Sequence, residues 1–375
     1  MDPALTCTAS HDEMARAVDV LVRGPFGAWI RDILVAHPRP DLVGLSVLYS
    51  GQVLAGLTVT AIARELWPGV AVVWGGPHVT ALRDAIVRDA GFGSFVDAFV
   101  FGYAEKTFVE LLDAIANRAP WPSACVRAGS GAIVAAVADP SAIPVFDDLS
   151  PYRHSRLTLP AQATRGCVFG RCRTCTYPRI EGTPTKLGEV SWRSVLRRAE
   201  REKAIVSFKD ALADQKTLEK IARVNAGGVR WSACTKMTVG LPKRFRRLAD
   251  AGLDTVEIGL ESLCPNSQQL IGKILSEGLF LATLDATGSA GIGLVVNYML
   301  GLPGENSAEA LKYLDRLHRI LDDARRTGAR VLLEENHFQL ERLAPVAASN
   351  LVEITGSWPW ASVLRWRARE DGDGR

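Results

Sequence analysis

Short apolar runs alternate with helix-length amphipathic stretches along most of the chain, and this alternation restricts the fold more than any other feature. In the first third, residues 42–48, 70–74 and 97–101 are apolar runs closed by glycine or serine, and residues 105–116 have the pattern of a helix. Short apolar strands separated by helices indicate a parallel sheet that is covered on both faces. We therefore expect an α/β protein that begins with a doubly wound, Rossmann-like domain.

A second series of the same kind begins near residue 159. Its last helix is well marked, because Ser307 can cap it and leucines line one of its faces. The series has six strands, fewer than the eight of a closed barrel, so we expect a partial (β/α)6 barrel. The candidate strands lie at 160–165, 203–208, 229–234, 254–259, 293–300 and 329–334, and the candidate helices at 191–201, 215–224, 242–251, 277–289 and 307–325.

The length of 375 residues exceeds what one hydrophobic core usually spans, so two domains are expected. Between the two series, runs at 124–128 and 132–137 flank Gly129-Ser130-Gly131, which predicts a hairpin with a three-residue turn. Prolines follow, as is typical of a connection between domains. The expected division is a Rossmann-like domain over 1–122, a hairpin and linker over 123–158, a barrel over 159–335 and a short C-terminal segment over 336–375.

The bulk composition excludes several classes of protein. The net charge is only +3, which gives no electrostatic case for binding nucleic acid or a membrane surface. No apolar run approaches the roughly 20 residues that span a bilayer. The first residues lack the basic-then-apolar pattern of a secretion signal. We therefore expect a cytoplasmic protein.

Three cysteines fall within nine residues, at Cys167, Cys172 and Cys175, whereas the other four are scattered singly. In a reducing compartment such a group favours metal or redox chemistry over disulfides. Structural zinc sites take four protein ligands, and no histidine lies within ten residues of this loop. A cubane iron–sulfur cluster held by three thiolates keeps one iron open for a ligand from outside the protein. We therefore expect these thiols to hold a 4Fe–4S cluster.

With this loop as its signature, the stretch from about 159 to 335 resembles the radical S-adenosylmethionine (SAM) superfamily. The family's usual spacing is C-x3-C-x2-C, and this chain has one residue more between its first two cysteines. Thr174 stands where the family usually has an aromatic residue, and Tyr177 is expected to take that role near the adenine. Segments after the second, fourth and fifth strands also agree with the family. The resemblance implies SAM contacts from Asp210, Glu261, Ser262, Asn297, Gly301, Pro303 and Tyr177.

The first domain resembles the cobalamin-binding domain that is fused to many radical SAM enzymes. The similarity lies in the glycine- and serine-rich segments that follow its apolar runs, at the strand ends where this fold binds ligands. The pattern that supplies a histidine to cobalt in other cobalamin proteins is absent, so His78 is expected at the nucleotide tail or in its loop. Only residues 4–9 could form a strand before 42, so the first β/α unit is expected to be missing. The implied cobalamin contacts are Ser46, Ser50, Gly75, Gly76, His78, Gly102 and Glu105.

The family resemblance implies an enzyme that makes a 5′-deoxyadenosyl radical from SAM. Its most plausible outcome is methyl transfer from methylcobalamin to an unactivated carbon of a small molecule or peptide. Two alternatives stay open, namely a radical SAM enzyme that rearranges, cyclises or epimerises its substrate, and a truncated, non-catalytic partner subunit. An external donor of the flavodoxin or ferredoxin type is expected to supply the electron.

Overall fold

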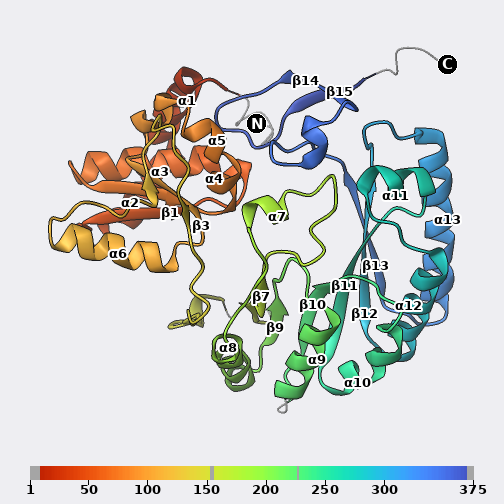
Figure 1. Ribbon diagram of the computed structural model, residues 1–375. Helices are drawn as coiled ribbons and strands as arrows, with labels where there is room; N and C mark the ends of the chain where they lie inside the picture. The colour runs from red at the N-terminus through yellow and green to blue at the C-terminus, as the bar shows by residue number, and fades with distance from the viewer. Residues whose placement is uncertain (1–8, 153–155, 226–227, 370–375) are drawn as a thin grey trace.

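The computed structural model describes residues 9–152, 156–225 and 228–369, and these form two α/β units joined by a returning C-terminal segment. Figure 1 shows the N-terminal unit beside an open barrel, with the last strands lying across the top of both. The expected α/β class is confirmed. Within the described residues, no helix has both the length and the apolar character needed to cross a bilayer.

The N-terminal unit is built on three parallel strands in the order β1–β2–β3. Two helices precede the sheet, and the first is closed by a capping box in which Ser10 and Glu13 bond each other's backbone amides. The predicted strands are confirmed, whereas residues 4–8 of the possible first strand lie outside the described part of the chain. The main elements are α1 (His11–Arg23), α2 (Pro25–Val35), β1 (Leu42–Ser46), α3 (Val53–Leu66), β2 (Ala71–Gly75), α4 (Pro77–Ala81), α5 (Arg83–Ile86), β3 (Ala98–Gly102) and α6 (Glu105–Ala116).

The predicted hairpin at 124–137 is wrong. Strand β4 (Cys125–Val126) pairs antiparallel with β3, and β5 (Ala135–Ala136) pairs parallel with the same strand, so the two do not pair with each other. The turn between them is held elsewhere, because Gly129 N donates to Ile86 O at 3.0 Å and Gly131 N donates to Val87 O at 2.7 Å. These bonds tie the turn to the end of α5 and direct both short strands to the edge of β3.

The second unit is a six-stranded parallel sheet in the order β13-β12-β11-β10-β9-β6, as expected for a partial barrel. All six predicted strands and all five predicted helices are present. The last helix is capped one residue earlier than predicted, because the side chain of Asn306, not Ser307, accepts from Glu309 N. The elements are β6 (Thr158–Ala161), α8 (Glu189–Glu202), β9 (Ile205–Phe208), α9 (Gln215–Val224), β10 (Trp231–Thr235), α10 (Phe245–Asp250), β11 (Leu253–Glu261), α11 (Pro265–Ile271), α12 (Glu277–Ser289), β12 (Gly293–Leu300), α13 (Ser307–Arg326) and β13 (Val331–His337).

The C-terminal segment returns to both units and ends in the antiparallel pair β14 (Val352–Gly356) and β15 (Arg365–Ala368). Between these strands, Trp360 inserts into the core of the N-terminal unit and is only 1% exposed. Its ring centroid lies 4.5 Å from that of Phe92 and 5.8 Å from that of Trp74. Large aromatic rings buried in this way contribute strongly to packing, so the segment holds the two units together.

Candidate functional site

A cavity of about 340 Å³ lies at the carboxyl ends of the barrel strands, where ligands bind in this class of fold. Its wall includes all three clustered cysteines, Cys167, Cys172 and Cys175, so the loop that was expected to hold a cluster is turned toward one space. The opposite wall comes from the ends of β10, β11 and β12. The cavity therefore combines the thiol loop with the polar strand ends that were predicted to face it.

Contacts from distant parts of the chain fix the cysteine loop. Gly166 has a φ of +75°, and a Cβ there would lie 3.0 Å from Pro184 Cα, so a side chain would strain the loop. Arg173 N donates to Ile271 O at 2.8 Å, and Arg173 O accepts from Val346 N at 2.8 Å. Just after the last cysteine, the Thr176 hydroxyl donates to Glu341 at 2.6 Å. The loop is thus anchored to the barrel on one side and to the C-terminal segment on the other.

Thiols are the donor groups that the cysteine loop brings to the cavity. Among the described residues, no three His, Cys, Asp or Glu side chains are grouped as they would be around one metal ion. Burial raises the pKa of the Cys175 thiol to about 11 and also raises that of Cys172, and the neighbouring cysteines add to both effects. Three cysteines of one loop that line a shared cavity are the number of ligands expected for a cubane with one open iron.

Glu261 and Lys273 place an ion pair in the cavity wall. Lys273 Nζ lies 3.2 Å from Glu261 Oε1 and also donates to the carbonyl of Gly259. The register between β11 and β12 shifts between Gly259 and Glu261, and Glu261 has a φ of +65°. Such irregularities are common beside functional sites, where they redirect a side chain. The predicted residue Glu261 is therefore in the cavity, whereas Lys273 was missed because no periodic pattern marks it.

Further groups complete the wall of the cavity. Lys236 Nζ lies 3.4 Å from the ring centroid of Phe169, which belongs to the cysteine loop. Burial lowers the pKa of Lys236, and the positive charge of Lys273 lowers it further. Asn297, which was predicted, lines the cavity and donates to Glu257 at 2.7 Å. Cys234, at the end of β10, also lines this cavity.

Four residues predicted to contact SAM lie outside this wall. Asp210 is buried and accepts from Ala163 N at 3.2 Å and from the Thr164 hydroxyl at 2.6 Å, so its carboxylate supports the start of the cysteine loop. The Ser262 hydroxyl is buried and donates to Tyr298 at 3.2 Å. Gly301 N donates to the Glu305 carboxylate at 2.7 Å, and Pro303 is buried. Tyr177, in contrast, lines the cavity and is 53% exposed.

The residues predicted to contact cobalamin fall into two groups, those at the strand ends and those bonded to other parts of the protein. Ser46, Gly75 and Gly102 end the three parallel strands, and Ser50 lies in the turn after β1. Gly76 has a φ of +100°, and a Cβ there would lie 2.6 Å from Val47 O. These five residues lie at or just after the carboxyl ends of the strands β1, β2 and β3, and their contacts with cobalamin stay predictions.

Two residues of that group are committed to the protein itself. His78 is buried, and its Nε2 lies 3.0 Å from the carbonyl oxygen of Trp360. The Glu105 carboxylate pairs with Arg165, two residues before the first clustered cysteine. The structure therefore places His78 against the C-terminal segment and Glu105 against the cysteine loop, and their contacts with cobalamin stay predictions.

We expect acidification to weaken the anchor at His78. Burial, with Arg342 nearby, lowers the pKa of His78 below its ordinary value of 6.5, so the folded protein keeps this ring neutral. The neutral ring of His78 contributes fully to the free energy of unfolding above pH 6.5. This contribution is lost as the pH falls below 6.5, by up to about 1.4 kcal/mol per pH unit. The midpoint temperature of thermal unfolding should therefore fall more steeply between about pH 7.5 and about pH 5.5 for the wild type than for His78→Gln. Equal slopes for the two proteins would contradict this expectation.

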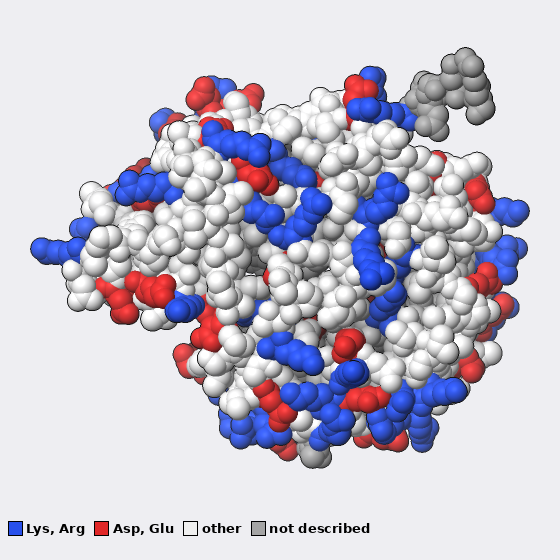
Figure 2. Space-filling model, viewed as in Figure 1, with Lys and Arg blue, Asp and Glu red and all other residues white. Residues whose placement is uncertain are grey.

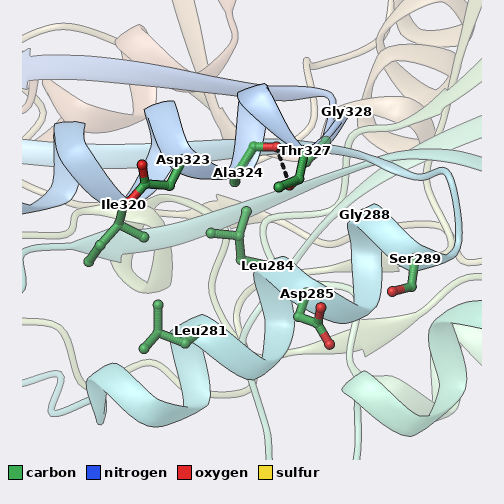
Figure 3. Close-up of a pocket in the computed structure, with 11 residues that line it drawn as sticks. Leu281, Leu284, Asp285, Gly288, Ser289, Ile320, Asp323, Ala324, Thr327 and Gly328 are labelled. Carbon is green, nitrogen blue, oxygen red and sulfur yellow. Dashed lines mark hydrogen bonds between the residues drawn. The ribbon is translucent and has the colours of Figure 1, made fainter.

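A second hollow carries no comparable chemistry. A groove of about 660 Å³ lies between α12 and α13, on the outer layer of the barrel, and Figure 3 shows residues that line it. Leucine, isoleucine and small residues line it, together with Asp285 and Asp323. Neither a cysteine nor a cation lines this groove, so the cavity at the cysteine loop remains the candidate site.

Two protein-family models match parts of the chain. Residues 162–317 match the model of the radical SAM superfamily, and residues 13–112 match that of the B12-binding domain. An uncharacterized methyltransferase of Pyrococcus horikoshii, PH0819, is 25% identical over 349 residues, covering 85% of this chain and 72% of that protein.

Solved structures share the architecture at low sequence identity. TsrM of Kitasatospora setae, a radical SAM methyltransferase with tryptophan and a SAM analogue bound, has a TM-score of 0.69 at 16% identity, covering 88% of this chain and 68% of TsrM. OxsB, a cobalamin-dependent SAM radical enzyme with aqua-cobalamin bound, has a TM-score of 0.68 at 16% identity, covering 92% of this chain and 58% of OxsB. These likenesses show the fold.

Proposed function

We propose that the chain, which matches both a radical SAM domain and a B12-binding domain, is a cobalamin-dependent radical SAM methyltransferase that acts on an unactivated carbon. One observation carries the proposal, namely a single cavity that joins the three thiols of the cysteine loop to charged groups of both signs. The end of β3 in the B12-binding domain meets that cavity's loop, since Tyr103 donates to Glu181 and Glu105 pairs with Arg165. The methyltransferase name of PH0819 adds support for methyl transfer.

We propose that Cys167, Cys172 and Cys175 hold a 4Fe–4S cluster and that SAM binds beside it. SAM carries an ammonium and a carboxylate group, and the cavity offers the carboxylate of Glu261 together with the ammonium of Lys236. Oppositely charged groups of this kind form the stronger class of hydrogen bonds. When bound, the cluster supplies the electron that cleaves SAM, and cobalamin supplies the methyl group.

Two exposed side chains lie in the turn after β1, where cobalamin is proposed to bind. Tyr49, in the turn after β1, is 70% exposed. Burial raises the pKa of the Tyr177 phenol most, and the nearby Tyr49 raises it further. Leu48 is also exposed. Apolar side chains left in solvent in this way are typical of ligand-binding surfaces. We propose that cobalamin lies here, between Ser46, Gly75 and Gly102 on one side and Tyr177 on the other.

The electron donor is proposed to be a small acidic protein of the flavodoxin or ferredoxin type. Residues 163–180, which contain the cysteine loop, include four arginines and no acidic residue. Figure 2 shows Lys and Arg side chains gathered across the middle of the face on which α7 (Tyr177–Ile180) lies in Figure 1. A positive surface beside the cluster would attract such a donor and would do so less at high ionic strength.

Anaerobic reconstitution with iron, sulfide and cobalamin tests the proposed function. The expected protein contains about four irons and four sulfides per chain, retains a corrin chromophore and releases 5′-deoxyadenosine from SAM under reductant. A gain of about 14 Da on a candidate small molecule or peptide would establish methyl transfer. A product of unchanged mass would instead indicate rearrangement or epimerisation. Zinc in place of iron, with no cleavage of SAM, would contradict an enzymatic function.

Glu261→Gln should weaken SAM binding while it leaves the cluster intact. The substitution keeps the shape of the side chain but removes its charge, so a charge-assisted bond becomes a neutral one. We expect the Kd for SAM to rise about tenfold, which corresponds to about 1.4 kcal/mol. Glu277→Gln is the matched control, since Glu277 pairs with Arg316 between α12 and α13. Equal affinities in the two variants would rule out a contact between Glu261 and SAM.

A further inference from the structure

Four side chains form a polar cluster where the N-terminal unit meets the cysteine loop, and we call Tyr103, Glu105, Arg165 and Glu181 the junction cluster. Two of them lie just after β3, and the other two flank the cysteines. The Arg165 guanidinium lies 4.0 Å from the ring centroid of Tyr103 and pairs with Glu105. The Tyr103 hydroxyl donates to Glu181, which also accepts from Gly166 N at 3.0 Å.

The junction cluster is closed to solvent at its centre. The Arg165 side chain is only 11% exposed. Two atoms of the junction cluster, Glu105 Oε2 and Arg165 Nη1, are buried and have no hydrogen-bond partner within the described structure. Burial and the bond to Glu181 raise the pKa of Tyr103, so its hydroxyl stays protonated and remains a donor. Buried polar groups in a network of this kind have little freedom to rearrange without disturbing their neighbours.

These contacts hold both ends of the cysteine loop from the same short turn. Arg165 and Gly166 directly precede the first cysteine, and Glu181 follows α7. Gly102 begins this turn, and its backbone amide donates a hydrogen bond to the Thr80 hydroxyl at 2.9 Å. Any shift of this turn would therefore reach the loop that carries the thiols.

We propose that Tyr103 and Glu105 are positioning residues that set the cluster loop against the cobalamin-binding domain. Glu105 then acts through Arg165 and not through a contact with the nucleotide tail of cobalamin. This inference rests on the proposed function, because it assumes that the loop holds a cluster that works with SAM. It predicts that the junction cluster can be weakened without removing either cofactor.

The test compares Tyr103→Phe and Glu105→Gln with the wild type, each reconstituted with iron, sulfide and hydroxocobalamin. Tyr103→Phe keeps the ring under Arg165 and removes only the hydroxyl, whereas Glu105→Gln keeps the shape and removes the charge. Glu110→Gln is the matched control, since Glu110 lies one turn further along α6 and pairs with the exposed Lys106.

In both junction variants we expect wild-type contents of iron and cobalamin. The change in the electron paramagnetic resonance spectrum of the reduced cluster on addition of SAM should be altered. The rate of 5′-deoxyadenosine formation should fall roughly tenfold, as small displacements of reacting groups produce. Glu110→Gln should match the wild type. A merely structural role would not change the spectroscopic response to SAM in protein whose thermal unfolding is unaltered.

Two results would overturn the inference alone. One is a wild-type response to SAM and a wild-type rate in both variants. The other is loss of cobalamin from Glu105→Gln with an unchanged cluster, which would restore Glu105 as a cobalamin contact. If Glu105→Gln does not fold, Tyr103→Phe decides the question by itself. Absence of a cluster from the wild-type protein would overturn the proposed function together with the inference.

Discussion

Cys172→Ala is expected to abolish the cleavage of SAM. Cys172 lines the cavity with Cys167 and Cys175, and a cubane that loses one of three protein ligands is left with two. Loss of an outer-shell partner already costs about 10- to 100-fold in metal affinity, so loss of a ligand should cost more than about a hundredfold. We expect iron content to fall far below about four per chain and 5′-deoxyadenosine to become undetectable.

Cys125→Ala is the matched control for this experiment. Cys125 lies in β4, at the edge of the N-terminal sheet, and does not line the cavity. It is half-buried, as Cys172 is, so both variants remove a thiol of similar exposure. The assignment would fail if Cys172→Ala kept its iron and its activity, or if Cys125→Ala lost them to the same extent.

The second large effect is expected at Trp360. Replacing this buried indole by alanine leaves a cavity among Trp74, Phe92 and Phe95, and removes the bond from Trp360 Nε1 to His11 Nδ1 at 3.2 Å. Truncation of a buried tryptophan typically lowers the free energy of unfolding by about 3–5 kcal/mol. Urea unfolding monitored by circular dichroism should show the loss as a lower midpoint for the transition of the N-terminal unit.

Two further variants set the scale for Trp360→Ala. Trp29 of α2 is 58% exposed, so Trp29→Ala should change the free energy of unfolding by no more than about 0.5 kcal/mol. Trp360→Phe keeps an aromatic ring and should give an intermediate loss. If Trp360→Ala were no more harmful than Trp29→Ala, the C-terminal segment would not serve as an anchor.

The regular elements could be predicted because local periodicity determines them. The helix over 105–116 and the strand over 293–300 were predicted at their observed bounds. The predicted hairpin failed for a non-local reason, since its glycine turn bonds to the end of α5 and its strands pair with β3. Turn chemistry alone could not reveal a competing partner about forty residues earlier in the chain.

The candidate site shows the same division between local and tertiary information. The spacing of the cysteines predicted the loop, and the position of Glu261 after a strand predicted its place in the wall. The sequence could not show that Asp210 turns to the backbone of Ala163, or that Lys273 reaches Glu261 from beyond α11. Such contacts depend on how strand ends and loops pack, which periodicity does not encode.

The position of Trp360 in the chain also has a consequence for synthesis. The N-terminal unit leaves the ribosome first, yet its aromatic core includes a ring that is made about 250 residues after β3 ends. Until Trp360 has been synthesised, Trp74 and Phe92 lack the Trp360 ring as a packing partner. The apolar surface that this ring buries then stays accessible to solvent. Nascent chains in this condition depend on chaperones or risk aggregation. The order of translation therefore delays completion of the first domain until nearly the whole chain has been made.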